Sequence, residues 1–362
     1  MLGLLNNIFL IGALFGVLLE GGLADKIRRR KVMFLTDYLA IACALGLLVV
    51  NLPVLLVFRF IAGVVSGLYN AIGAIVLSEI MPNVVCGFGN ALGYTLVTVS
   101  ILFSYLLPVM FKKSTLIENA NIFLAITILV PIIRQLTIPF MMKHDTAKYI
   151  YNMHPDKERA NILMQQAYAE VYSPESVHIV TGKAIDCLTR EEQTGKVTFR
   201  KLFSAKYRTR LYSGVFVCVA LQLSGINYLI FYSTELFRKS GKDKAMTIVV
   251  GLSNVAGSLV ALYAIRHLGR KFSIVWGVLA QGIGMFLLFV GFKTDSFFIL
   301  AIDTVLYVSA FAVGLGGNQM AYVAEVLPPL GVSIACAVQW ILTALVAQLI
   351  YLLIELLEPQ WL

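Results

Sequence analysis

The sequence predicts an all-α, polytopic membrane protein built as two helical bundles. Hydrophobic residues make up 59% of the 362 positions and charged residues only 14%, whereas soluble domains average about 25% charged residues. The mean hydropathy is +0.83. Long apolar runs recur along the chain, and each can cross a bilayer as a helix at about 1.5 Å per residue.

The apolar runs fall into two groups of five on either side of a polar centre. Residues 143–210 are polar, with apolar side chains at helical spacing, which predicts a cytoplasmic linker of short amphipathic helices. The N-terminal bundle is expected over 1–142 and the C-terminal bundle over 211–362. The predicted spans are 2–24, 32–52, 54–79, 87–111 and 122–142, followed by 211–237, 246–266, 272–292, 297–326 and 331–357.

The basic residues predict the orientation of the chain. Segments 25–31, 143–210 and 266–271 hold 20 of the 29 Lys and Arg residues. An even number of spans separates these segments, so they share one side of the membrane, which the positive-inside rule makes the cytoplasm. Both ends of the chain are then extracytoplasmic. Because most basic residues lie in these loops, membrane topology accounts for the net charge of +9, and no nucleic-acid partner is predicted.

Polar side chains gather in the span 211–237. Gln222 and Asn227 are five residues apart, about 140° around a helix, so both can reach one broad cavity without sharing a narrow stripe. Ser224 and Gly225 lie between them and allow the backbone to bend. Amides inside a membrane can simply join helices. They also suit an uncharged solute that carries many hydroxyl groups.

Two motifs of the first half of the chain recur in the second half. The segment 22–31 resembles 267–271, and Ser-Glu-Ile-Met-Pro at 78–82 resembles Ala-Glu-Val-Leu-Pro at 324–328. Each pair falls at corresponding places in its half. Two bundles repeated in parallel about a cavity are typical of secondary transporters.

With these motifs the chain resembles the major facilitator superfamily and, within it, the sugar porter family of hexose carriers and proton–sugar symporters. The resemblance covers nearly the whole chain. The matching residues are Gln222 to Asn227 with Phe231-Tyr232-Ser233, Asn254 fifteen residues before Gly269-Arg270-Lys271, Arg59-Phe60 with Gly63 and Gly67, Ser78-Glu79 with Pro82, and His144 to Tyr149.

The resemblance implies transport of a hexose-like sugar by alternating access, as uniport or coupled to protons, in a plasma or vacuolar-type membrane. It implies sugar binding by the amides of Gln222, Asn227 and Asn254, with Phe231 and Trp340 as the apolar wall. Two departures add candidates to this set. Tyr94 stands where the family has a sugar-binding Gln, and Asn318 lies in Gly-Gly-Asn-Gln-Met, which replaces a Gly-Pro-x-Pro-Trp segment.

Charges near the cytoplasmic helix ends are candidates for gating. Salt bridges there would hold the outward-open state and break to open inward, although exposed charge that only fixes topology is the alternative. The family's Arg partners align here with Cys86 and Val332, so each latch lacks one cation. Arg59 corresponds to the position that faces an acid in proton-coupled relatives. The predicted gating residues are Asp25, Arg29, Arg30, Arg59, Glu79, Arg270, Lys271 and Glu325.

The ends of the chain differ from the family pattern. The first span carries the loop motif that follows the family's second helix, and the last resembles the eleventh, so we expect ten helices of twelve, as a fragment or as a shortened protein. Two other functions stay open: a transport-deficient membrane sensor or assembly protein, and a carrier of another polar solute. An ionic solute is disfavoured because Asp303, the nearest candidate partner, is expected toward the outer end of its helix. No enzyme activity, cofactor or metal is predicted.

Overall fold

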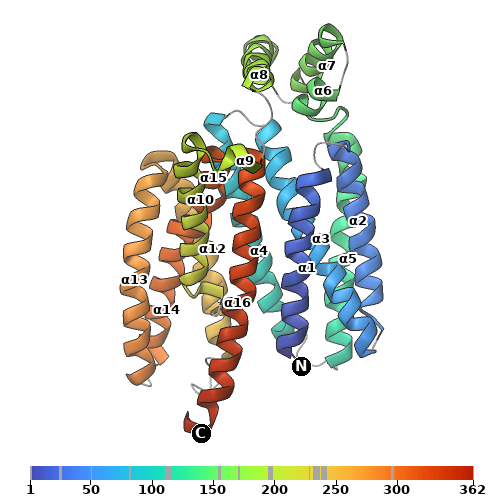
Figure 1. Ribbon diagram of the computed structural model, residues 1–362. Coiled ribbons are helices and arrows are strands. Elements are labelled where there is room, and N and C mark those ends of the chain that lie inside the picture. Colours follow the sequence, from blue (N-terminus) through green and yellow to red (C-terminus); the bar gives the residue numbers. More distant parts are fainter. Residues whose placement is uncertain are drawn as a thin grey trace. The chain divides into compact units, whose positions relative to one another are not determined.

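The protein is helical throughout the part of the chain that the structure describes (Figure 1). That structure is a computed structural model. No strand occurs among the described residues, in agreement with the all-α prediction. The described residues are 2–23, 27–49, 51–80, 83–110, 116–153, 156–169, 172–194, 199–227, 229–230, 237, 243–294 and 297–361.

Two compact units are formed, and each draws on segments that are distant in sequence. Unit 1 comprises Met1–Asn83, Ala120–Leu211 and Leu327–Ile341. Unit 2 comprises Val84–Asn119, Tyr212–Val326 and Leu342–Leu362. The predicted division into two bundles and a linker, at residues 142 and 210, stays a prediction.

Unit 1 contains the first three helices, most of α5 and the linker helices. Close packing of α1 on α3 depends on glycine, because a Cβ at Gly12 or Gly16 would overlap the carbonyl oxygen of Phe60 or Val64. Such close backbone contacts are common between membrane helices. The helices are α1 Leu2–Leu23, α2 Arg29–Gly46, α3 Leu52–Ile80, α5 Leu116–Met141, α6 Ala147–Met153, α7 Lys157–Ala169, α8 Pro174–Thr194 and α9 Phe199–Leu202.

The linker helices α6 to α8 share a small apolar core. Tyr151, Ala160, Met164 and Leu188 are buried there. The segment is also tied to α3, because the Tyr172 hydroxyl donates a hydrogen bond to the Ile80 carbonyl at 3.0 Å. Burial raises the pKa of Tyr172, so this hydroxyl keeps its proton at neutral pH.

Unit 2 packs its helices around a core that includes Leu221, Ile226, Val250 and Val308. The predicted span 297–326 is not one continuous α-helix. A π-helical turn over Ala312–Gly316 divides it, at a glycine-rich sequence that allows the wider turn. The helices are α4 Asn83–Met110, α10 Ala205–Leu223, α12 Asp243–His267, α13 Arg270–Thr294, α14 Phe297–Phe311, α15 Gly317–Val326 and α16 Pro329–Trp361, of which α4, α10 and α16 also extend into unit 1.

The apolar helices support a multi-pass membrane protein. Six helical segments among the described residues are long and apolar enough to cross a membrane. Large apolar side chains such as Leu136, Phe216 and Phe286 are exposed on the helices, as expected where lipid is the solvent. The six segments are Leu52–Leu77, Gly89–Leu107, Lys244–His267, Arg270–Gly291, Phe298–Val326 and Leu330–Leu349, and the shorter apolar helices are Asn7–Glu20 and Leu124–Phe140.

Candidate functional site

A break after α10 brings the two predicted amides of this span together. Gly225 has φ +80°, a left-handed conformation that glycine adopts without steric cost and that ends the helix. Beyond the break, Asn227 donates from Nδ2 to Gln222 Oε1 at 2.5 Å. In an uninterrupted helix these side chains would point about 140° apart, as the sequence predicts. The bend therefore produces a contact that helical spacing alone does not.

The broken backbone is supported by α14. The Tyr307 hydroxyl donates to the Ser224 carbonyl at 2.5 Å, and Ser224 Oγ donates to the Leu221 carbonyl at 2.6 Å. These bonds satisfy polar groups close to the break, where an unpaired group would be costly in a membrane. Gln222 itself is buried.

A second polar pair joins α4 to α12. Tyr94 donates its hydroxyl proton to Asn254 Oδ1 at 3.0 Å, and Asn254 is buried. One turn further along both helices, Thr98 and Ser258 share a hydrogen bond at 3.1 Å. Tyr94 can approach because residue 316 is glycine, where a Cβ would overlap the Tyr94 hydroxyl. Two of the predicted binding residues are thus in direct contact.

The π-helical turn uses the fourth predicted amide, Asn318. Asn318 Nδ2 donates to the carbonyls of Val313 and Gly314 at 2.8 and 3.0 Å, and both carbonyls belong to the turn. The other polar atom of this side chain, Asn318 Oδ1, is buried and has no hydrogen-bond partner among the described residues. The neighbouring Gln319 donates to the Cys218 sulfur at 3.0 Å. Asn318 is therefore mainly occupied with holding its own helix.

For two other predicted binding residues, Trp340 and Phe231, the binding role stays a prediction. Trp340 is partly buried in α16, within the segment of that helix assigned to unit 1, whereas the amides belong to unit 2. Phe231 lies outside the described residues. Asp303, the acid considered as a partner for an ionic solute, is buried in the second turn of α14 beside Gly291.

The predicted cytoplasmic charges form a network in unit 1. Arg29 donates from Nη2 to Glu79 Oε1 at 3.0 Å and from Nε to Oε2 at 3.3 Å, and both side chains are less than a tenth exposed. Thr146 donates its hydroxyl proton to Glu79 Oε2 at 2.5 Å. The Arg30 backbone N–H donates to Asp145 Oδ1 at 3.3 Å. Helix ends far apart in sequence are therefore tied together by charge.

The remaining gating candidates differ in their surroundings. Arg270 and Glu325 form an ion pair in unit 2, at the position that repeats Arg29 and Glu79, but Glu325 is 43% exposed. Lys271 is exposed at the start of α13. Arg59 Nε is buried and has no hydrogen-bond partner in the described part of the chain. Asp25 lies outside the described residues.

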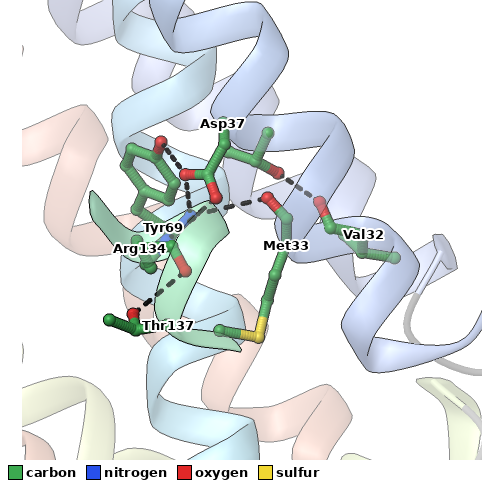
Figure 2. Close-up of polar contacts among 7 residues, drawn as sticks. Val32, Met33, Asp37, Tyr69, Arg134 and Thr137 are labelled. Atoms are coloured by element: carbon green, nitrogen blue, oxygen red, sulfur yellow. Dashed lines mark hydrogen bonds and ion pairs between the residues drawn. The ribbon is translucent and has the colours of Figure 1, made fainter. Parts of the chain in front are cut away.

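A buried ion pair that the sequence analysis missed joins three helices of unit 1 (Figure 2). Asp37 is fully buried; it accepts a hydrogen bond from the Tyr69 hydroxyl at 2.7 Å and one from Arg134 Nε at 3.2 Å. Arg134 Nη2 contacts the same carboxylate, and its guanidinium carbon lies 4.2 Å from the centre of the Tyr69 ring. Ionisable residues inside predicted spans 32–52 and 122–142 were the available signal, because charge within a membrane is costly.

The fold matches solved structures of the major facilitator superfamily. A proton:xylose symporter of this superfamily, XylE, bound to 6-bromo-6-deoxy-D-glucose, aligns with a TM-score of 0.78 and 18% identity over 99% of this chain and 80% of that one. The inward open conformation of the xylose transporter XylE from E. coli gives 0.72 with 20% identity over 96% of this chain and 78% of that one. At this identity the likeness shows the fold.

A family model described as "Sugar (and other) transporter" matches residues 1–361, so the chain belongs to this family of membrane transporters. Hexose transporter 1 of Toxoplasma gondii is 23% identical over 365 residues, covering 94% of this chain and 64% of the relative. Facilitated glucose transporter protein 1 of Caenorhabditis elegans is 28% identical, covering 88% of this chain and 65% of the relative. The chain thus spans slightly less than two thirds of these relatives.

Proposed function

We propose that this protein carries a hexose-like sugar across a membrane by alternating access. The observation that carries the proposal is the pair of neutral contacts in unit 2, Gln222 with Asn227 and Tyr94 with Asn254. Amides and a phenol both donate and accept hydrogen bonds, so they can exchange their mutual bonds for bonds to sugar hydroxyls. Curated relatives are named as hexose and glucose transporters, which supports the same substrate class.

The charged pairs supply a proposed gate. Arg29 with Glu79, and Arg270 with Glu325, lie at helix ends whose basic loops we assign to the cytoplasm. A pair that exists in only one conformation stabilises that conformation by its own interaction free energy. Breaking these pairs would then accompany inward opening. The membrane is proposed to be of plasma or vacuolar type.

An uptake assay can also distinguish proton-coupled transport from uniport. The galactose-proton symporter of Escherichia coli is 24% identical over 356 residues, which makes coupling a reasonable expectation for this chain. Uptake that is faster at acidic external pH and collapses with a protonophore would support a symporter. Uptake that does not respond to either would support a uniporter.

Transport itself is tested by uptake of labelled hexose into cells that lack their own hexose carriers. We expect saturable uptake by the full-length protein that carries these residues, with competition by unlabelled hexoses. A surface-expressed protein with no uptake of hexoses above the empty-vector background would contradict the proposal.

A further inference from the structure

A pocket of about 540 Å³ lies in unit 1, where the ends of α2 and α5 meet the linker helices α6 and α7. Figure 1 shows α6 and α7 beyond the ends of α2 and α5. The predicted spans 32–52 and 122–142 give way to the amphipathic linker helices at this point, so the pocket lies near the level expected for lipid headgroups. None of the residues that line it takes part in the amide contacts of unit 2.

The walls of this basic pocket carry excess positive charge. Among the described residues that line it, four side chains are permanently charged cations, against one carboxylate, that of Asp145. That carboxylate accepts a hydrogen bond from the backbone N–H of Arg30 at the start of α2, so part of its charge is engaged by the helix end. The four cationic residues are Arg28, Arg30, Lys31 and Lys143.

Nearby acids do not remove this excess. Glu79 is occupied by Arg29 and Thr146, and neither of these two residues lines the pocket. Lys31 and Lys143 are exposed and form no ion pair within the described ranges. Cations that converge on a concave surface without matching carboxylates favour an anionic ligand.

Apolar and aromatic side chains also line the basic pocket. Phe34, Tyr149 and Ile150 contribute to it, and the Arg30 guanidinium lies 5.6 Å from the Phe34 ring centre. The volume is in the range of about 300–1,000 Å³ that small-molecule sites occupy. The pocket therefore has room for an organic group attached to the anion.

We propose that the basic pocket binds an organic phosphate, with the phosphate on Arg28, Lys31 and Lys143 and the organic part against Phe34 and Tyr149. Guanidinium and ammonium groups donate strong, charge-assisted hydrogen bonds to phosphate oxygens. The ligand is either a phospholipid headgroup or a soluble phosphate monoester, since both present the same chemistry. The proposal does not depend on sugar transport.

Binding is tested on the purified full chain in neutral detergent by microscale thermophoresis. The probes are dioctanoyl phosphatidic acid and glycerol 3-phosphate, which share a phosphate monoester but differ in their acyl chains. Dioctanoyl phosphatidylcholine is the reference lipid without net charge. We expect at least one phosphate monoester to bind and the phosphatidylcholine not to bind. Phosphatidic acid alone would identify a lipid site, and binding of both probes would identify a site for soluble phosphates.

The variant Lys31→Gln with Lys143→Gln removes two lining cations at exposed positions and should fold, which gel filtration checks. We expect its dissociation constant for the bound probe to rise about fivefold or more. The matched control, Lys201→Gln with Arg208→Gln, removes two exposed cations that do not line the pocket. We expect less than about a twofold change there, because these two cations lie outside the pocket lining and salt screens their longer-range attraction to the ligand. Equal weakening in both variants, equal binding of phosphatidylcholine, or binding of neither phosphate would overturn the proposal.

Discussion

The two units differ in how their buried polar groups are paired: unit 2 pairs neutral groups around the break after α10, and unit 1 pairs opposite charges. Around the break after α10, unit 2 pairs neutral groups, as in Asn227 with Gln222. Unit 1 pairs full charges, as in Arg134 with Asp37 and Arg29 with Glu79. A neutral amide that loses its partner costs about 1–3 kcal/mol, and a solute hydroxyl can replace that partner. A buried charge that loses its partner costs about 3–5 kcal/mol.

This difference suits the two units to two different proposed roles, solute binding and structural support or gating. Neutral pairs can open for each solute molecule and close again at a modest cost, which suits a binding site. Charge pairs resist opening, which suits a frame or a latch. The comparison predicts that changes in unit 1 affect stability and conformation, and that changes around the break in unit 2 affect solute affinity.

The largest expected effect is on stability, at Asp37. Asp37→Ala leaves Arg134 and the Tyr69 hydroxyl without their acceptor, and we expect the protein to lose about 3 kcal/mol or more of stability. This loss is measured by heating the protein in detergent and monitoring the folded fraction by gel filtration with fluorescence detection.

Two further variants make the Asp37 prediction specific. Asp37→Leu combined with Arg134→Leu removes both charges and should recover much of the lost stability, since a charge pair can often be replaced by apolar residues. Thr137→Ala, which removes an exposed hydroxyl on the same helix, should behave as the native protein. If the double variant unfolds at a lower temperature than Asp37→Ala, the charge pair is not what joins these helices.

Glu79→Gln is expected to have the next largest effect, on conformation. The change keeps the side-chain shape but removes the charge that Arg29 binds, a type of contact worth about 1.5–3 kcal/mol. We expect the inward-open population to rise, measured as faster labelling of a cysteine introduced at the cytoplasmic side. Labelling at the native rate would leave Glu79 as a topology or packing residue.

Asn227→Ala and Asn254→Ala should each weaken hexose uptake, with normal surface expression. Loss of one or two hydrogen bonds to the sugar corresponds to about 1 kcal/mol or more, which is about a fivefold or larger rise in the half-saturating concentration. Ser100→Ala is the matched control, because Ser100 is an exposed residue of α4 that bonds its own helix. Unchanged uptake in both Asn variants would exclude these residues from the site.

The smallest expected effect is at Glu325. This carboxylate is 43% exposed in its pair with Arg270, and exposed ion pairs contribute about 0–1 kcal/mol. Glu325→Gln should therefore change cytoplasmic cysteine labelling less than Glu79→Gln does. A larger effect at Glu325 would mean that the second latch, not the first, controls inward opening.

The sequence predicts the fold well because hydropathy and basic loops are strong signals in membrane proteins. It predicts the all-α class and most of the long apolar helices, and it marks Arg29 and Glu79 as gating candidates without pairing them. Side-chain geometry was harder to foresee. The Gln222 to Asn227 contact depends on the positive φ of Gly225, and the occupation of Asn318 depends on a π-helical turn. Helical spacing assumes a regular helix and misses both.

The Asp37 and Arg134 pair shows a different limit. These residues are 97 positions apart, and no local pattern links them. Each could have been noticed as a charge inside an apolar run, but only tertiary packing shows that they neutralise each other.

The central claim is that the solute binds to the neutral groups of unit 2. Its most direct test is the dissociation constant of a labelled hexose for purified Asn254→Ala and Glu79→Gln, measured side by side with the native protein by scintillation proximity. We predict about a fivefold or larger rise for Asn254→Ala and less than about a threefold change for Glu79→Gln. Native affinity in Asn254→Ala, together with a larger loss in Glu79→Gln, would contradict the claim.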